Sequence, residues 1–303
     1  MILQFKAPKN IKKGTSVKEI LKSEFNLSSR RIAKLKTQKG MHVNGKDVFT
    51  TYELKPGDSL EVNVVDKLNS DIKPENVPLD FVYDDKCLSV INKPVNMPVH
   101  TTSSKKEGTL ANALIYHWIE NNETSASFHI VTRLDMNTSG LLIIAKNGHI
   151  HNLLEQQLIE RKIERRYIAI VEGFIKDDDG RIDVPIGRPS TESIAREALS
   201  EEKGGQRAVT NYWVKQRFLI DGKQFSLVEL KLDTGRTHQI RVHMKHIGHP
   251  LVGDTLYNPT STILDRHALH AYKIKFFHPL TLEPLEFESE IPNDMNNLIN
   301  LKR

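Results

Sequence analysis

One short loop of the 303-residue sequence concentrates residues that could act on a substrate. Asp135 stands two positions after Arg133, and small residues follow at positions 138–140 before an apolar run begins. An ionised carboxylate can transfer protons or act as a nucleophile, so Asp135 is a candidate catalytic group. The alternative interpretation is structural, because an aspartate in a turn often caps its own backbone.

A second segment, residues 232–243, combines a glycine turn with several basic side chains. Gly235 can adopt a strained turn, and Thr237 can cap the helix that follows. The start of a helix exposes backbone amides that favour an anion, so this segment is a candidate anion site. The alternative is a capped amphipathic helix with a solvated basic face. The basic residues in the first turns are Arg236, His238 and Arg241.

Other catalytic patterns are incomplete in the sequence. The histidines His238, His243, His246 and His249 suggest a metal site, but no two of them are four residues apart and no HExxH motif occurs. We therefore expect no metal. The sequence also contains neither a phosphate-binding P-loop nor a G-x-S-x-G nucleophile turn. The single cysteine, Cys87, begins an apolar strand pattern and is expected in the core.

The positive charge is concentrated near the N-terminus. The chain has 43 Lys and Arg against 38 Asp and Glu residues, a net charge of +5. Residues 1–70 hold 14 basic and 7 acidic residues, a net charge of +7, so the rest of the chain carries −2. This asymmetry predicts a separate module that binds a polyanion, or else a solvated lysine-rich face. We find no signal-peptide pattern and no apolar run long enough to span a membrane, and we expect a cytoplasmic protein.

The basic module should contain two helices and a hairpin. Apolar spacing predicts a helix over residues 17–25 and a second helix that Ser28 caps and that ends near Gly40. Asn44-Gly45 predicts a hairpin turn, and residues 60–64 predict another strand. This order resembles the S4-type RNA-binding domain over residues 13–66, followed by a linker at 67–77. The residues expected to contact RNA phosphates lie on the second helix: Arg30, Arg31, Lys34 and Lys36.

Residues 78–303 are expected to form the larger domain. Strands are predicted at 79–84, 87–92, 140–145, 167–173, 207–218, 225–232 and 271–277, and helices at 110–121, 150–161 and 237–247. Many strands with few helices favour an α+β domain over a regular βαβ alternation. We therefore predict a mixed, largely antiparallel β-sheet flanked by helices.

The order of motifs in this domain resembles that of the RluA-type pseudouridine synthases. The resemblance covers residues 78 to about 292. Three residues depart from the usual pattern, Asn96, Thr101 and Thr132, and these departures weaken the assignment to a particular substrate subfamily. The matching motifs are Asn92-Lys93-Pro94, Arg133-Leu134-Asp135-x-x-Thr138-Ser139-Gly140, Arg166-Tyr167-x-Ala169-x-Val171-x-Gly173, the segment from Thr234 to His243, and Gly248-His249-Pro250-Leu251-x-Gly253-Asp254-x-x-Tyr257.

The resemblance implies the pseudouridine synthase fold and an isomerase that needs no cofactor. Its reaction detaches N1 of a uridine from the ribose and joins the ribose to C5, through positive charge on the sugar that a carboxylate can stabilise. By resemblance, Asp135 attacks the sugar or removes a proton from it, and Arg241 is its charge partner. Tyr167 then stacks on the uracil and takes the C5 proton. Substrate-binding positions implied in the same way are Arg133, Leu134, Thr138, Arg236, His238 and Ile240.

The implied partner is structured RNA, from which the target uridine must be flipped out. Large-subunit ribosomal RNA is the expected substrate, with transfer RNA as the alternative. A monomer is expected because the reaction needs one pocket. Two competing hypotheses are a non-catalytic RNA-binding factor for ribosome assembly and a metal-dependent hydrolase that uses the histidine cluster.

Overall fold

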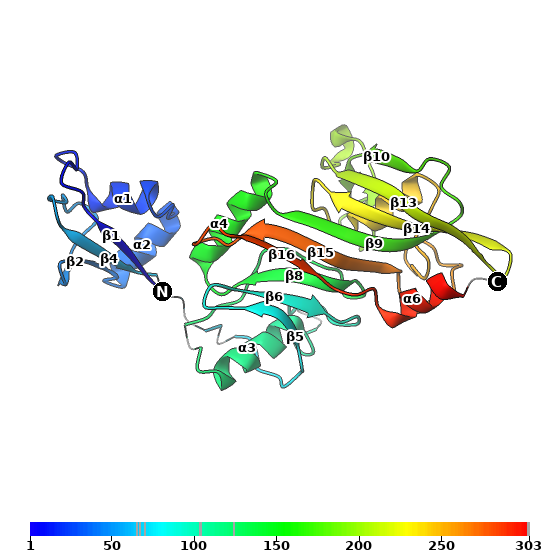
Figure 1. Cartoon of the computed structure of the whole chain (residues 1–303), viewed down its shortest axis with the longest axis horizontal. Coiled ribbons are helices and arrows are strands. Elements are labelled where there is room, and N and C mark those ends of the chain that lie inside the picture. The colour runs from blue at the N-terminus through cyan, green and yellow to red at the C-terminus, as the bar shows by residue number, and fades with distance from the viewer. Residues whose placement is uncertain (65, 67, 70, 103–104, 124, 302–303) are drawn as a thin grey trace.

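The computed structural model describes residues 1–64, 66, 68–69, 71–102, 105–123 and 125–301. A small N-terminal unit lies beside a larger unit that is built on one curved sheet (Figure 1). Helix α4 (Gly148–Ile159) of the larger unit faces the smaller one. Within the described residues, no helix is long and apolar enough to cross a membrane.

The N-terminal unit packs two short helices against an antiparallel sheet of order β1-β4-β2-β3. Ser16 and Ser28 cap the two helices through their side chains. Asn44 and Gly45 both have positive φ, as a two-residue hairpin turn requires. The predicted helices and hairpin are confirmed, whereas β1 has no counterpart among the predicted elements. The bounds are β1 (Ile2–Lys6), α1 (Val17–Ser23), α2 (Ser29–Thr37), β2 (Met41–Val43), β3 (Lys46–Asp47) and β4 (Ser59–Asn63).

Ten strands of the described residues form the sheet of the larger unit, in the order β10-β13-β14-β9-β15-β8-β6-β5, with β7 and β16 paired at β8 and β15. The pairings are antiparallel except that of β15 with β8. The predicted α+β class with a mixed, largely antiparallel sheet is therefore confirmed. The bounds are β5 (Asp80–Asp84), β6 (Leu88–Lys93), β7 (His129–Ile130), β8 (Ser139–Ala145), β9 (Glu164–Glu172), β10 (Asp179–Asp183), β13 (Val209–Ile220), β14 (Lys223–Leu232), β15 (Leu269–Phe277) and β16 (Pro284–Glu288).

The parallel pairing of β8 with β15 depends on one glycine. Gly140 has a φ of +111°, and a Cβ atom at this position would lie 2.2 Å from the carbonyl oxygen of Ala271. A side chain would therefore push the two strands apart. Because β8 begins directly after the Asp135 loop, this close approach also fixes where that loop leaves the sheet.

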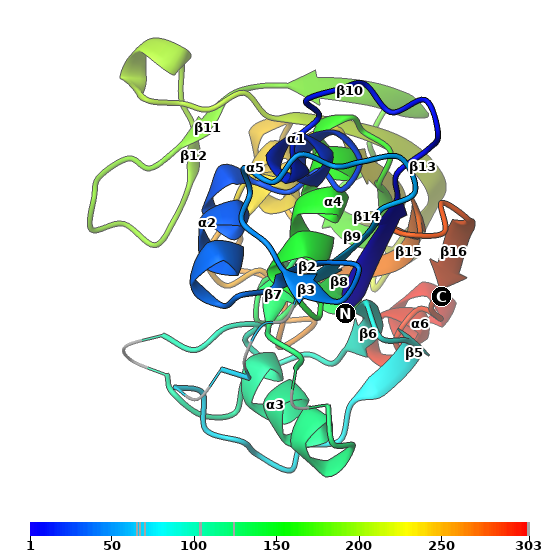
Figure 2. The ribbon, with the colours of Figure 1, turned by 90° about the vertical axis from the view of Figure 1, so that its left-hand side faces the viewer.

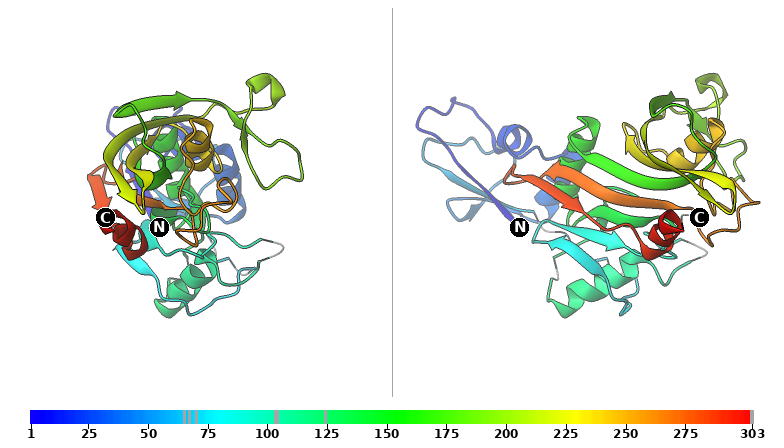
Figure 3. Two further views of the ribbon diagram at one scale, coloured as in Figure 1. Left: turned by 90° about the vertical axis from the view of Figure 1, so that its right-hand side faces the viewer. Right: turned by 45° about the vertical axis from the view of Figure 1, so that its right-hand side comes forward.

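Helices cover parts of the sheet and bring the second motif to its concave side. Figure 3 shows α5 (Gln239–His246), in gold, within the curve of strands β13 and β14. Helix α3 (Leu110–Glu120) packs near β5 and β6, and α6 (Asn293–Asn300) lies at the C-terminal end of the chain. A segment with β11 (Ile186–Gly187), β12 (Glu197–Ala198) and the 3-10 turn η1 (Glu201–Lys203) extends away from the sheet (Figure 2).

The predicted linker, residues 67–77, contacts the larger unit where it is described. Ile72 is buried in the core of that unit, and the Asn69 side chain accepts a hydrogen bond from Phe128 N. Lys67 and Ser70 of this segment, like Val65 of the predicted S4-type domain, lie outside the described residues. The described part of the segment is therefore packed against the sheet rather than extended away from it.

Candidate active site

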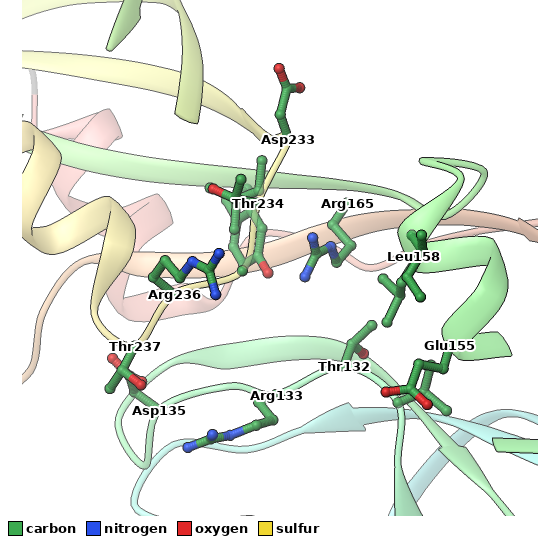
Figure 4. A pocket seen from close by; sticks show the side chains of 15 residues that line it. Thr132, Arg133, Asp135, Glu155, Leu158, Arg165, Asp233, Thr234, Arg236 and Thr237 are labelled. Atoms are coloured by element: carbon green, nitrogen blue, oxygen red, sulfur yellow. The ribbon is translucent and has the colours of Figure 1, made fainter. Parts of the chain in front are cut away.

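The structure brings the predicted catalytic and substrate-binding residues of the larger domain into one pocket. Its volume is about 50 Å³, and it shares Asp135, Tyr167 and Arg236 with a larger cavity of about 510 Å³. Figure 4 shows the larger cavity between the Asp135 loop, strand β9 and the segment that precedes α5. The predicted residues that line the smaller pocket are Arg133, Leu134, Asp135, Thr138, Tyr167, Arg236, His238, Ile240 and Arg241.

The carboxylate of Asp135 faces Arg241. The Arg241 Nη1 donates a hydrogen bond of 3.1 Å to Asp135 Oδ2, and the His238 Nε2 lies 3.8 Å from the same oxygen. The Asp135 side chain is 28% exposed, so it remains open to the cavity. Its backbone carbonyl accepts a hydrogen bond from Thr138 N and so closes the turn. The backbone thus makes the turn, and the carboxylate is directed toward Arg241.

Arg241 is itself held by a buried aspartate. Its Nε and Nη2 donate to the two carboxylate oxygens of Asp254, at 2.7 and 2.8 Å, and the Asp254 side chain is 0% exposed. The guanidinium also lies over the ring of Tyr257, at 4.8 Å from the centroid. A bidentate pair fixes the plane of a guanidinium, so Asp254 determines where Arg241 meets Asp135.

The charges in this group are stabilised by one another. Burial by itself would lower the pKa of Arg241, but the hydrogen bonds and charges of Asp254 and then Asp135 outweigh burial and raise it. Burial by itself would raise the pKa of Asp254, but the Arg241 guanidinium outweighs burial and lowers it. The positive Arg241 therefore lies between the side chains of Asp254 and Asp135.

Thr237 does not cap the helix that carries Arg241, contrary to the prediction. Helix α5 begins at Gln239, after His238, which has a left-handed φ of 58°. The Gln239 side chain instead turns back and accepts a hydrogen bond from Arg236 N. His238 directs its Nδ1 to the hydroxyl of Tyr257, 2.9 Å away. This turn directs His238 toward Asp135, and burial lowers the pKa of His238, so the imidazole is neutral at pH 7.

Tyr167 forms an apolar wall of the pocket. It lies on β9, is 5% exposed, and packs in the core with Leu134 and Ile240. Burial raises the pKa of Tyr167, Arg165 opposes this shift, and Asp135 adds to it. The phenol is therefore neutral at pH 7 and offers an uncharged face to a flat ring.

Two buried histidines that the sequence analysis did not single out hold the Asp135 loop. The Thr138 hydroxyl lies 2.7 Å from His267 Nε2, and the Ser139 hydroxyl lies 2.9 Å from His270 Nδ1. Burial lowers the pKa of both histidines to about 4, so both are neutral at pH 7. His267 lies just before β15, and His270 lies at the start of that strand. The sequence of this segment contains no motif with a known local geometry.

Lys93 also contacts the Asp135 loop. Its Nζ is buried and donates hydrogen bonds to three carbonyl oxygens, among them that of Met136 at 3.0 Å. Burial lowers the pKa of Lys93 to about 7, and the charge of Asp135 opposes this shift. The Asn92-Lys93-Pro94 motif therefore has a direct contact with the Asp135 loop, although the sequence analysis assigned it no role.

The basic residues of α2 are divided between two environments. Arg31 is 9% exposed and, with Lys34, forms an ion pair with Asp66. Their charges are thus directed into the junction between the two units, in contrast to the expectation that all four basic residues face RNA. Arg30 and Lys36 are exposed.

The histidines that suggested a metal site have separate partners. His243 lies between the Thr210 hydroxyl and the Val184 carbonyl oxygen, and His249 contacts the Glu172 carbonyl oxygen. Cys87 is buried, as expected, and burial raises the pKa of its thiol to about 11.

Similarity to solved structures defines the class of this fold. The human RNA pseudouridylate synthase domain containing 1 aligns with a TM-score of 0.59 and 26% identity, over 75% of this chain and 95% of that one. The human RNA pseudouridylate synthase domain containing 4 aligns with a TM-score of 0.59 and 22% identity, over 73% and 92%. The chain therefore has the fold of pseudouridine synthases.

Sequence comparison then identifies the family. The model of the RNA pseudouridylate synthase family matches residues 88–246. The uncharacterized RNA pseudouridine synthase YlyB of Bacillus subtilis is 43% identical over 265 residues, 86% of this chain and 85% of that protein. The ribosomal large subunit pseudouridine synthase D of Zymomonas mobilis is 37% identical over 262 residues, 82% and 81% of the two chains. This chain belongs to the RNA pseudouridylate synthase family and is a pseudouridine synthase.

Proposed function

We propose that this enzyme converts uridine to pseudouridine in large-subunit ribosomal RNA, as a cytoplasmic monomer with Asp135 as its catalytic carboxylate. The relative named as a ribosomal large subunit synthase supports this substrate. The observation that carries the catalytic assignment is the contact between Asp135 Oδ2 and Arg241 Nη1, at 3.1 Å, in a pocket with apolar walls.

The reaction requires a carboxylate that is charged and accessible. The N1–C1′ bond of uridine breaks, a C5–C1′ bond forms, the C5 proton leaves and N1 gains a proton. Arg241 holds one oxygen of Asp135, and among the described residues the other oxygen, Oδ1, has no hydrogen-bond partner. We assign Oδ1 to the sugar, either to attack C1′ or to take a proton from the ribose.

The walls of the pocket support recapture of the detached uracil. Leu134, Tyr167 and Ile240 offer apolar surface against which a flat base can stack and from which water is excluded. We propose that Tyr167 stacks on the uracil and that, after C5 has joined the ribose, its oxygen takes the C5 proton while its own hydroxyl proton passes to solvent, so that the phenol is neutral before and after the step. Loss of that proton restores the conjugated ring, which makes the proton acidic at this stage.

The N-terminal unit is proposed to act as an S4-type RNA-binding domain. Exposed Arg30 and Lys36 on α2 are positioned for contacts with phosphates, which raise affinity without selecting a base sequence. The target uridine must still leave its stack, at a cost of a few kcal/mol. We propose that contacts outside the pocket offset this cost.

Release of tritium from RNA labelled at uridine C5 tests the reaction directly. We expect the wild-type enzyme to release tritium from unmodified large-subunit ribosomal RNA and not from transfer RNA. Asp135→Asn should abolish release while RNA binding persists, because binding rests on phosphates. The exposed Asp265 provides a matched control, and Asp265→Asn should retain full activity.

The possible outcomes separate the alternatives. Release from transfer RNA alone would keep the enzyme and overturn the proposed substrate. Binding of ribosomal RNA without release would favour the assembly-factor hypothesis. Substantial turnover by Asp135→Asn would overturn the role of Asp135.

A further inference from the structure

The cavity beyond the candidate active site is far larger than the pocket at Asp135. The outer cavity has a volume of about 510 Å³, compared with about 50 Å³ for the inner pocket. Arg165 lines the outer cavity and does not line the inner pocket. We propose that Arg165 and Arg236 together bind a backbone phosphate of the RNA strand beside the flipped uridine. This inference rests on the proposed function and extends it to the phosphate groups of the substrate.

Strand β9 places Arg165 on the same side as Tyr167. Residues two apart on a strand share a face, so Arg165 projects toward the cavity on which Tyr167 borders. Its neighbour Arg166 projects to the other side, where it forms ion pairs with Glu164 and Glu229. Two adjacent arginines therefore differ sharply in their surroundings.

Arg165 has no carboxylate partner within the part of the chain that the structure describes. No ion pair of 4.0 Å or less involves Arg165, and its Nε is buried without a hydrogen-bond partner. A buried donor without an acceptor is costly, and folded proteins rarely retain one. A ligand that brings an acceptor to this guanidinium would remove that cost.

Arg236 approaches the same space from the segment that precedes α5. Figure 4 shows the side chains of Arg165 and Arg236 extending into the cavity toward one another. Arg236 Nε donates to the Arg207 carbonyl oxygen, so this contact leaves the charge of its guanidinium without a carboxylate. A Cβ atom at Gly235 would lie 3.1 Å from Arg165 Nη1, so the backbone packs closely on the Arg165 guanidinium. Two converging cations favour an anion between them.

The carboxylates around the cavity do not take this place. Asp135 is engaged by Arg241, and Asp233 pairs with Arg181 and points away from the cavity in Figure 4. Glu155 lies on α4, on the other wall of the cavity. The anion is therefore expected from the substrate, and in RNA it is a phosphate, whose oxygens match the planar fork of a guanidinium.

Single-turnover tritium release with excess enzyme separates binding from chemistry. We expect Arg165→Gln to raise the enzyme concentration at half-maximal rate about tenfold and to leave the maximal rate within about twofold, because a phosphate contact outside the reacting bonds acts on binding. The salt dependence of binding to unmodified ribosomal RNA should fall by a slope of about 0.7, the value for one phosphate of a single strand. Arg165→Lys should restore part of the affinity.

Two further variants test whether Arg165 and Arg236 share one phosphate. The factor by which Arg165→Gln/Arg236→Gln lowers affinity for RNA should be smaller than the product of the factors for the two single variants. Glu155→Gln, on the opposite wall, should not weaken binding. Equal losses of RNA affinity in Glu155→Gln and Arg165→Gln would instead indicate that Glu155 and Arg165 form a structural pair, and would overturn the proposal.

The wild-type enzyme distinguishes failure of this inference from failure of the proposed function. If the wild type releases no tritium from any RNA, the proposed function is wrong. If the wild type is active and Arg165→Gln has unchanged affinity and salt slope, the phosphate site is wrong. A lower maximal rate with unchanged affinity would also overturn it, because Arg165 would then act on Tyr167 or the chemistry. Thermal unfolding of each variant checks that it is folded.

Discussion

Asp135 in the active site and Asp66 at the junction of the two units both face arginines, but their surroundings differ. Asp66 is 8% exposed and receives hydrogen bonds from Arg31, Lys34 and the backbone N of Gly148, with His129 at 3.8 Å. The carboxylate of Asp135 is 28% exposed and, among the residues that the structure describes, receives one hydrogen bond, from Arg241. The carboxylate at the junction is saturated with donors, whereas the one in the pocket keeps an oxygen for another partner.

The difference indicates how the fold separates structural from reactive carboxylates. Burial alone would raise the pKa of Asp66, but the surrounding donors outweigh burial and hold the pKa well below its usual range. In the active site the saturated carboxylate is Asp254, which takes two donors of Arg241. The rigid pair of Asp254 and Arg241 then presents one remaining donor to Asp135.

Loss of Asp254 should have the largest effect on activity. In Asp254→Asn, Arg241 keeps a single carboxylate and is free to pair fully with Asp135, which would occupy the reactive oxygen. We expect the maximal rate of tritium release to fall by about 10²-fold, as misplacement of a catalytic group does. Because one side of a buried ion pair is removed, the free energy of unfolding should fall by about 3 kcal/mol.

The control for this prediction is binding. Arg241 does not need Asp254 to keep its charge, and RNA affinity rests mainly on phosphate contacts, so affinity for ribosomal RNA should stay within about twofold of wild type. Full activity of Asp254→Asn would contradict the view that Asp254 positions Arg241.

Acidification should lower the free energy of unfolding through buried histidines at the junction and at the active site. His149 beside the junction and His267 beside Thr138 each have a pKa of about 4, lowered from 6.5 chiefly by burial. Between pH 6.5 and pH 4 the unfolded chain binds more protons than the folded one. Each histidine's contribution to the free energy of unfolding is therefore fully present above pH 6.5 and declines as the pH falls toward 4. From pH 7 to pH 5 each histidine should cost about 2 kcal/mol.

Urea unfolding at pH 7 and pH 5 measures this loss. His149→Gln and His267→Gln should each flatten the pH dependence of stability. Of these two variants, His267→Gln alone should also slow tritium release, because His267 contacts the Asp135 loop and His149 lies beside the junction. Parallel pH profiles for wild type and both variants would show that other groups control acid stability.

The sequence motifs predict the inner pocket well because each motif is local. Asp135 is joined to its turn within three residues, and Tyr167 is placed by the alternation of its strand. Residues that contact the site from distant parts of the chain cannot be predicted from local motifs. His267 contacts Thr138 across 129 positions, and no period or turn signal links them.

Two local predictions also differ from the structure for tertiary reasons. Thr237 has the side chain of a helix cap, yet Gln239 supplies the hydrogen bonds that hold the segment before α5. The position of Arg31 on α2 predicts an exposed basic side chain, yet Arg31 donates a hydrogen bond to Asp66, 35 residues later, and is buried at the junction. Local patterns indicate that a side chain can make a contact, but the fold decides which partner is available.

Asp66 offers the smallest expected effect and the sharpest test of the comparison. In Asp66→Asn, Arg31 and Lys34 lose their carboxylate partner, and the unfolding free energy should fall because a buried cation is left unpaired. Turnover at saturating RNA should remain within about twofold, since the Asp135 loop and Arg241 make no contact with Asp66 and distant sites act independently. Lys34, which is 44% exposed, becomes available to phosphate, so the salt slope of RNA binding should rise by about 0.7. A tenfold loss of turnover at saturating RNA would instead show that the junction also governs the pocket, and that the saturated carboxylate of Asp66 helps to keep the carboxylate of Asp135 reactive.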